Sequence, residues 1–241
     1  MNCKNCTTEI NSKFCPNCGQ PASLKRIDGH YIIHEIEHVL HFERGILYTI
    51  RELLRNPGES IRHFITANRG RLVKPIIFII VTSLIYTIIT RFFHIDEFFI
   101  KYKGPKGAEK PAFSIVLDWL KVNYGYLNIL SGVLIAIWLK VFFKKYGYNF
   151  FELLVMLCYV LGISIVISTF FAIIEGVTHF KLSGIATIIG WIYVVIAIGS
   201  FYGSKKITNY IYALICYFLG LISFSILIFT LGLVIDFVAK K

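Results

Sequence analysis

The chain shows two patterns of hydrophobic and polar positions, which meet near Leu72. Before this point polar and apolar residues are mixed, whereas after it long apolar runs alternate with short polar segments. Five of these runs approach the roughly 20 residues that a membrane-spanning helix needs. They cover residues 72–93, 124–143, 150–174, 185–202 and 210–237. The pattern predicts an all-α polytopic membrane protein, with about five transmembrane helices over residues 72–241.

The composition excludes an ordinary soluble domain. Residues of the set AVILMFWYC make up 56% of the 241 residues, charged residues make up 16%, and the mean hydropathy is +0.67. Soluble domains carry roughly 25% charged residues, so this chain has too few to cover a soluble surface. The same values exclude disordered, collagen-like and disulfide-scaffold proteins. The net charge of +11 favours contact with anionic lipid over nucleic acid, because basic residues orient membrane proteins.

Four cysteines form two C-x2-C pairs at the start of the chain, Cys3 with Cys6 and Cys15 with Cys18. Such pairs predict a tetrahedral site for one structural Zn²⁺, because the two thiolates of each turn face the same ion. Four sulfur ligands leave no open position for a substrate. The alternative is two disulfides, which requires an oxidising compartment. We expect a zinc ribbon over residues 1–20 that takes its folding free energy from the metal.

A segment with amphipathic periodicity follows over residues 21–71. No apolar leader precedes it, so we expect the first 70 or so residues to be a domain and not a removed signal peptide. Asp28 is placed to cap a helix whose apolar side chains gather on one face at 100° per residue. Asn56-Pro57-Gly58 interrupts that helix, and residues 59–65 predict a second, shorter one. We expect interfacial amphipathic helices here.

The polar face of this segment is rich in histidine, and His34-Glu35-Ile36-Glu37-His38 matches H-E-x-x-H. On a helix, histidines four residues apart can hold zinc while the glutamate activates a water molecule. His30 and His41 lie on the same face and extend this second candidate metal site, with Glu52 or Glu59 as a candidate third ligand. Three interpretations stay open: a polar face toward solvent or headgroups, a metal- or proton-sensing cluster, and a metallopeptidase site with Glu35 as the catalytic residue.

Lysine and arginine are distributed unequally over the segments between the expected spans. A dense basic set stands directly before the first span, and it comprises Arg62, Arg69, Arg71 and Lys74. Because basic residues favour the cytoplasmic side, we expect an inner N-terminus and an outer C-terminus. Each of the four can contribute around 1 kcal/mol of attraction to lipid phosphates. Simple topological anchoring is the alternative role of this set.

The head that ends in Cys15-Pro16-Asn17-Cys18-Gly19-Gln20 resembles a large family of bacterial integral membrane proteins of unknown function. A later run carries the same resemblance through Gly45, Thr49, Leu53, Pro57-Gly58, Arg62, Arg69, Arg71 and Pro75. It covers roughly residues 1–85, with Ala67-Asn68-Arg69 in place of the usual Gly-Lys-Arg. The resemblance implies the architecture and a location in the bacterial inner membrane, and it implies no activity.

These observations favour a non-enzymatic inner-membrane protein of adaptor or regulatory type. Its cytosolic zinc ribbon would be a docking surface for a protein partner, and the bilayer with its anionic headgroups would hold the rest. A membrane metallopeptidase and a carrier or channel for lipids or small neutral solutes are the alternatives. Small residues in the fourth span, Ser183, Ala186, Gly190, Ala197 and Ser200, predict a close helix–helix seam. That seam lies either within the chain or between subunits of a homo-oligomer.

Overall fold

The structure is a computed structural model that describes residues 6, 8, 9, 14–18, 45–95 and 124–239, without the side chains of 124–127, 236, 238 and 239. The chain divides into two compact units, residues 1–41 and 42–241. In the first unit the described residues include three cysteines that lie together. The second unit is a bundle of helices, which includes residues of both the expected interfacial segment and the expected membrane domain. The finer division at residues 20 and 71 stays a prediction.

Seven α-helices form the described part of the second unit. Two short helices come first, α2 (Ile46–Arg55) and α3 (Pro57–Thr66), and we call them together the α2–α3 cap. Five long helices follow: α4 (Pro75–Phe92), α6 (Tyr124–Phe142), α7 (Phe150–Thr178), α8 (Ser183–Gly203) and α9 (Ile207–Ala239). A 3-10 turn, η2 (Lys144–Tyr146), lies between α6 and α7. The described residues of this unit contain no strand, which confirms the all-α prediction.

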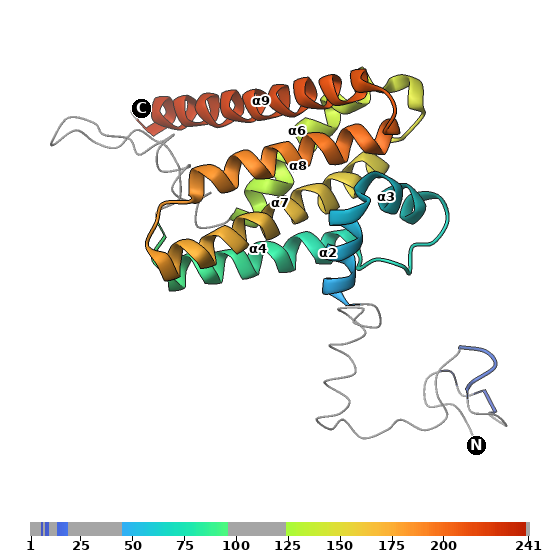
Figure 1. Ribbon diagram of the computed structural model, residues 1–241. Helices are drawn as coiled ribbons and strands as arrows, with labels where there is room; N and C mark the ends of the chain where they lie inside the picture. Colours follow the sequence, from blue (N-terminus) through green and yellow to red (C-terminus); the bar gives the residue numbers. More distant parts are fainter. Residues whose placement is uncertain (1–5, 7, 10–13, 19–44, 96–123, 240–241) are drawn as a thin grey trace, which may run out of the picture. The chain divides into compact units, whose positions relative to one another are not determined.

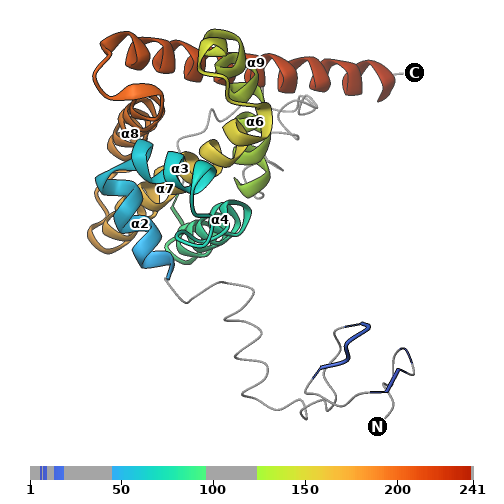
Figure 2. The ribbon, with the colours of Figure 1, turned by 90° about the vertical axis from the view of Figure 1, so that its right-hand side faces the viewer.

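Helix α7 lies at the centre of the bundle (Figure 1). It packs against α4, α6 and α8, and α9 packs against α6 and α8. Helix α3 packs against α8 and α7, and α2 packs against α3 and α7. Figure 2 looks onto the end of the bundle that these two short helices cover. The α2–α3 cap is therefore part of the same folded unit as the long apolar helices.

Four of the long helices, α4, α7, α8 and α9, are long and apolar enough to cross a membrane by length and composition. Residues 128–142 of α6 are apolar but form a shorter segment. Large apolar side chains remain exposed along these helices, including Phe151, Phe170 and Phe237. Exposed apolar surface on this scale is typical of helices that face lipid or a partner. The helices are consistent with a membrane protein, and a fifth span through α6 stays a prediction.

Local sequence signals explain where several helices begin. Pro57 and Pro75 stand in the first turn of α3 and α4, where the missing N–H has no helical partner to lose. Helix α7 begins with a capping box. The Asn149 side chain accepts from Glu152 N at 2.9 Å, and Glu152 Oε2 accepts from Asn149 N at 2.7 Å. Two N–H groups that the helix leaves without partners are thereby satisfied.

The stripe of small residues in α8 lies at a seam within the chain. Ala186, Gly190 and Ala197 are buried. A Cβ added to Gly190 would lie 2.7 Å from Ser164 Oγ of α7, so the absence of a side chain allows α8 to approach α7 closely. Of the two positions expected for this seam, the structure supports the internal one. A homo-oligomer stays a prediction that rests on other surfaces.

Candidate functional site

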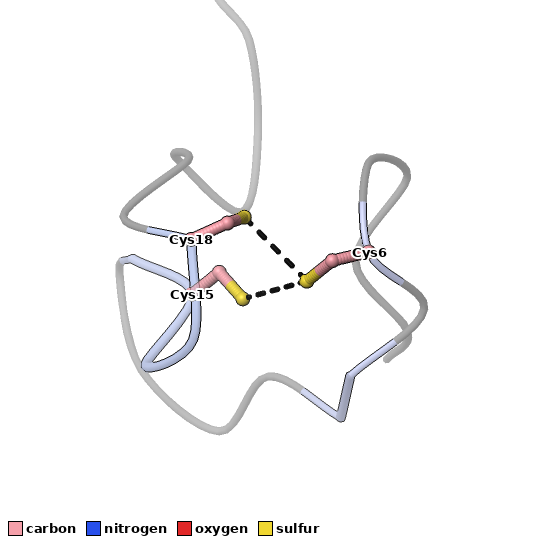
Figure 3. Close-up of side chains that lie close together, drawn as sticks. All are labelled: Cys6, Cys15 and Cys18. Carbon is pink, nitrogen blue, oxygen red and sulfur yellow. Dashed lines mark hydrogen bonds between the residues drawn. The ribbon is translucent and has the colours of Figure 1, made fainter.

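Three thiols lie together in the first unit (Figure 3). The sulfur of Cys6 is 3.5 Å from the sulfur of Cys15 and 3.5 Å from that of Cys18. All three sulfurs lie within 4.8 Å of one another, so they form a group that could hold a metal ion. The described cysteines are free thiols, and 3.5 Å is far longer than the roughly 2.05 Å of a disulfide bond.

The spacing of these sulfurs fits a tetrahedral thiolate site. Zinc–sulfur bonds of about 2.3 Å place two sulfurs of a tetrahedron about 3.8 Å apart, close to the distances seen here. Cys15 is buried, whereas Cys18 is exposed. Cys3, the fourth predicted ligand, lies outside the described residues. The structure therefore brings together three of the four predicted ligands.

The surroundings of Cys6 favour its charged form. Its sulfur and the Thr8 hydroxyl are hydrogen-bonded at 3.4 Å. Hydrogen bonds from the side chain and backbone of Thr8 lower the pKa of Cys6 from 9.0 to about 6. Because the thiolate is the form that ligates metals, the lowered pKa of Cys6 favours metal binding at neutral pH.

At one end of the bundle, the α2–α3 cap is joined to α8 by an arginine. Arg62 Nη1 of α3 donates to Ser200 O at 2.6 Å and to Phe201 O at 2.8 Å. The last four carbonyls of a helix have no partner within the helix, and hydrogen bonds from a charged donor are stronger than neutral ones. Arg62 therefore satisfies two backbone carbonyls at the end of α8. Its position in the sequence also predicts a contact with lipid. That lipid contact stays a prediction.

The two remaining carbonyls at the end of α8 are satisfied from α9. Asn209 Nδ2 donates to Tyr202 O at 3.1 Å and to Gly203 O at 3.2 Å. Its Oδ1 accepts from the Tyr146 hydroxyl at 2.9 Å. Asn209 is fully buried, so each of these hydrogen bonds replaces one that water cannot supply. Side chains from three other elements thus fix the C-terminal end of α8.

Gly58 allows α3 to lie directly on the backbone of α8. A Cβ at this position would be 2.4 Å from Ser200 C and 2.5 Å from Phe201 N. These atoms belong to a helix backbone that cannot rotate away, so a larger residue requires the two helices to separate. The spacing of Gly58 and Arg62, one helical turn apart, places the close approach beside the arginine.

Arg71, in the segment between α3 and α4, is paired with α2. Its Nη2 lies 2.6 Å from Glu52 Oε2, and its Nε donates to the Tyr48 hydroxyl at 3.1 Å. The hydrogen bond to Tyr48 raises the pKa of Arg71, with Glu52 adding to the effect. Both members of the ion pair are partly exposed, at 33% and 22%, so water screens the pair. Glu52, a candidate metal ligand in the sequence, is engaged by this arginine.

In the segment between α3 and α4, both backbone groups of Val73 form hydrogen bonds to other helices. Its N–H donates to Thr49 Oγ1 of α2 at 3.1 Å, and its carbonyl accepts from the Tyr159 hydroxyl of α7 at 2.7 Å. Thr49, Val73 and Tyr159 are all buried. These bonds connect α2 to α7 through Val73, two residues before the start of α4, so they help to set how the cap sits on the bundle.

The remaining residues that the sequence predicted for lipid or metal binding fall into two groups. Arg69 and Lys74 are exposed, as a lipid contact requires. The histidines of the second candidate metal site, His30, His34, His38 and His41, lie outside the described residues, as does Glu35. The lipid roles and the histidine site stay predictions.

Sequence reasoning missed the partners of Arg62, Thr49, Tyr159 and Asn209. For Arg62 a signal was present, because Gly58 one turn earlier marks a close approach of backbones. Asn209, which lies in the predicted loop just before the last apolar run, is a polar residue that the apolar pattern does not interpret. Neither its burial nor its carbonyl partners follow from its neighbours in the sequence.

The described residues define a class: a protein with a helical bundle, helices apolar enough for a membrane, and three thiols that could hold a metal ion. Residues 43–87 match the profile of a family described as a protein of unknown function (DUF3667). The match covers α2, α3 and the first part of α4, and so includes Gly58, Arg62 and Thr49. No curated protein and no solved structure matches the chain. The predicted likeness to a family of unknown function is supported for this segment.

Proposed function

We propose that the protein is a non-enzymatic integral membrane adaptor with a structural zinc site in its N-terminal head. The convergence of Cys6, Cys15 and Cys18 at thiolate-site distances carries the proposal. Cys3 supplies the fourth sulfur by its spacing from Cys6. A metal with four sulfur ligands stabilises a fold and leaves no position for substrate, so the head presents a surface and performs no reaction.

The proposed location is the bacterial inner membrane, with a cytoplasmic N-terminus and an outer C-terminus. Basic residues gather on the segments at the end of the bundle that α2 and α3 cover: Arg51, Arg55, Arg62, Arg69, Arg71, Lys74, Lys140, Lys144, Lys145, Lys205 and Lys206. Over the full sequence, the segments expected on this side carry 16 lysines and arginines, and the segments expected on the other side carry nine, six of them within residues 91–123. An excess of this kind favours the cytoplasmic side. Exposed Arg69 and Lys74 are available there to lipid phosphates.

Metal content of the purified full-length protein tests the zinc site. We expect one zinc per chain in the wild type, near none in Cys15→Ser, and one in His34→Ala/His38→Ala. Two ions in the wild type that fall to one in the histidine variant would reveal a second, open site and would favour the metallopeptidase alternative. No zinc in the wild type would remove the basis of the proposal.

The adaptor role needs a separate test. Proximity labelling in cells would compare the proteins labelled by the full chain with those labelled by a chain that carries Cys15→Ser. We expect a defined set of cytosolic proteins to be lost from the variant, since the head loses its fold without metal. Identical sets for the two chains, at equal membrane abundance, would contradict the role.

A further inference from the structure

Helix α2 carries an outward stripe in which leucine and arginine alternate. Leu47 is 81% exposed and Leu54 is 49% exposed, and Arg51 and Arg55 are both exposed. At 100° per residue these four positions fall within about 100° of arc, so they share one face. We call this set, Leu47, Arg51, Leu54 and Arg55, the α2 outer face. On the opposite side of the helix, Thr49 and Leu53 are fully buried.

The direction of this face is fixed by contacts on the other side of α2. Thr49 Oγ1 accepts from Val73 N, and Leu53 O accepts from the Tyr193 hydroxyl of α8 at 3.1 Å. Glu52 is held by Arg71 at 2.6 Å. Helix α2 therefore cannot turn to bury its leucines without breaking these bonds, and the outer face points away from the bundle.

The same contacts give the depth of α2 along the bundle. At a rise of about 1.5 Å per residue, Tyr193 lies about 15 Å before the end of α8, and Tyr159 lies about 14 Å inside α7. The hydroxyls of these two tyrosines donate to Leu53 O and Val73 O, and Val73 lies two residues before the start of α4. Helix α2 therefore lies beside α7 and α8, at the level where the apolar helix α4 begins.

The charge of the outer face is not compensated within the described chain. Arg62 and Arg71 are engaged by carbonyls and by Glu52, whereas Arg51 and Arg55 have no ion pair or hydrogen bond to any residue in the described ranges. Glu52 lies outside the stripe and is already paired with Arg71. Two free guanidinium groups flanked by two exposed leucines fit a ligand that has both an anionic and an apolar part.

We propose that the α2 outer face docks on the headgroups of anionic phospholipids. Leu47 and Leu54 enter the boundary between headgroups and acyl chains, and Arg51 and Arg55 bind the phosphates, for which the guanidinium fork is suited. This inference depends on the membrane location and is independent of the cysteine site. It adds the α2 outer face to the lipid contact that the sequence pattern predicts at Arg62, Arg69, Arg71 and Lys74.

Photo-crosslinking of the full-length protein in lipid nanodiscs tests the assignment. One set of nanodiscs carries a diazirine-labelled phosphatidylglycerol and the other an equally labelled phosphatidylcholine, and mass spectrometry maps the labelled residues. In the wild type, we expect residues 46–55 to be labelled by phosphatidylglycerol about tenfold more than by phosphatidylcholine. Arg51→Gln/Arg55→Gln should remove this preference, and Leu47→Ser/Leu54→Ser should lower labelling by both lipids.

Lys205→Gln/Lys206→Gln is the matched control, because it removes the same charge from exposed positions on the same end of the bundle. It should leave the labelling of α2 unchanged. Equal labelling by the two lipids, an unchanged preference in the arginine variant, or an equal loss in the lysine control would overturn the proposal. Competition by millimolar inorganic phosphate would reassign the face to a free anion, and crosslinks from α2 to a second copy of the chain would reassign it to an oligomer; either result would also overturn the proposal.

Discussion

The cysteine group and the α2–α3 cap both precede the first long apolar helix, but different interactions hold them. Three thiols converge in the first unit, and the proposed metal supplies the free energy that so short a segment lacks. The cap takes its stability from the bundle, through buried Leu53 and Phe64 and through hydrogen bonds to α8 and to Val73. Two neighbouring regions of one chain therefore have separate sources of stability.

We therefore expect the two regions to respond to different substitutions. If the cysteine group binds the proposed metal, loss of that metal should disorder this group and leave the buried contacts of the cap intact. Changes at the junction of α3 with α8 leave the sulfurs in place and act on the bundle. Four substitutions test whether the cysteine group and the helical bundle are stabilised independently.

The largest expected effect is on metal binding. Cys15→Ser removes one of the three sulfurs, so we expect bound zinc to fall from about one ion per chain to near none. The unfolding temperature of the helical unit should stay unchanged in the same sample. Cys158→Ser, on α7, is the control and should keep its metal. A lower unfolding temperature of the bundle on metal loss would show that the two regions share their stability.

Gly58→Ala should have the largest effect on the bundle. The added Cβ would lie 2.4 Å from the backbone of α8, so α3 must move away, and we expect a loss of about 3 kcal/mol in the free energy of unfolding. Reversible unfolding in mixed micelles measures it. Gly184→Ala is the matched control, since its Cβ would meet nothing within 4 Å. Equal stability of the two variants would mean that α3 does not rest on α8.

Arg62→Met keeps much of the side-chain bulk and removes both hydrogen bonds to the end of α8. We expect a loss of about 2 kcal/mol, because hydrogen bonds from a charged donor are worth roughly 1.5–3 kcal/mol. Arg69→Met removes the same charge from an exposed position and should change the stability by less than about 0.5 kcal/mol. If the two variants behave alike, net charge and not the contact with α8 is responsible. Metal content should be normal in both.

Thr49→Val should give the smallest of the four effects. The change preserves shape and leaves Val73 N without its 3.1 Å partner, and we expect a loss of about 1 kcal/mol. Hydrogen exchange at the Val73 amide should become faster while exchange in the middle of α7 stays slow. Unchanged protection of the Val73 amide from exchange would show that this hydrogen bond does not attach α2 to the segment before α4.

The apolar runs made most of the helical architecture predictable. The run expected at residues 185–202 is helix Ser183–Gly203, and the run expected at 72–93 contains helix Pro75–Phe92. Long apolar segments must form helices in lipid, because a helix satisfies its own backbone groups. The boundary near Asn56 was also visible, since Pro57 can stand only near the start of a helix. Some predicted ends moved by several residues: α7 continues to Thr178, beyond the expected residue 174, and α9 begins at Ile207, before the expected residue 210.

The cysteine group was predictable for a different reason. Its ligands lie close together in the sequence, so the spacing of Cys15 and Cys18 already limits their geometry. The role of Arg62 was not predictable in the same way, because its partners lie 138 and 139 residues away along the chain. A basic residue before an apolar run looks the same whether it binds a phosphate or a carbonyl.

The local order of residues was enough to indicate the helices of the bundle, their apolar character and a cysteine spacing that could hold a metal. The tertiary structure was needed to show that Gly58 and Arg62 contact the end of α8 and that Asn209 is buried there. It was also needed to show that Leu47 and Arg51 point outward. The physical reason is that burial, and the choice of a hydrogen-bond partner, depend on which distant helix lies alongside. A pattern along one chain segment carries no information about that neighbour.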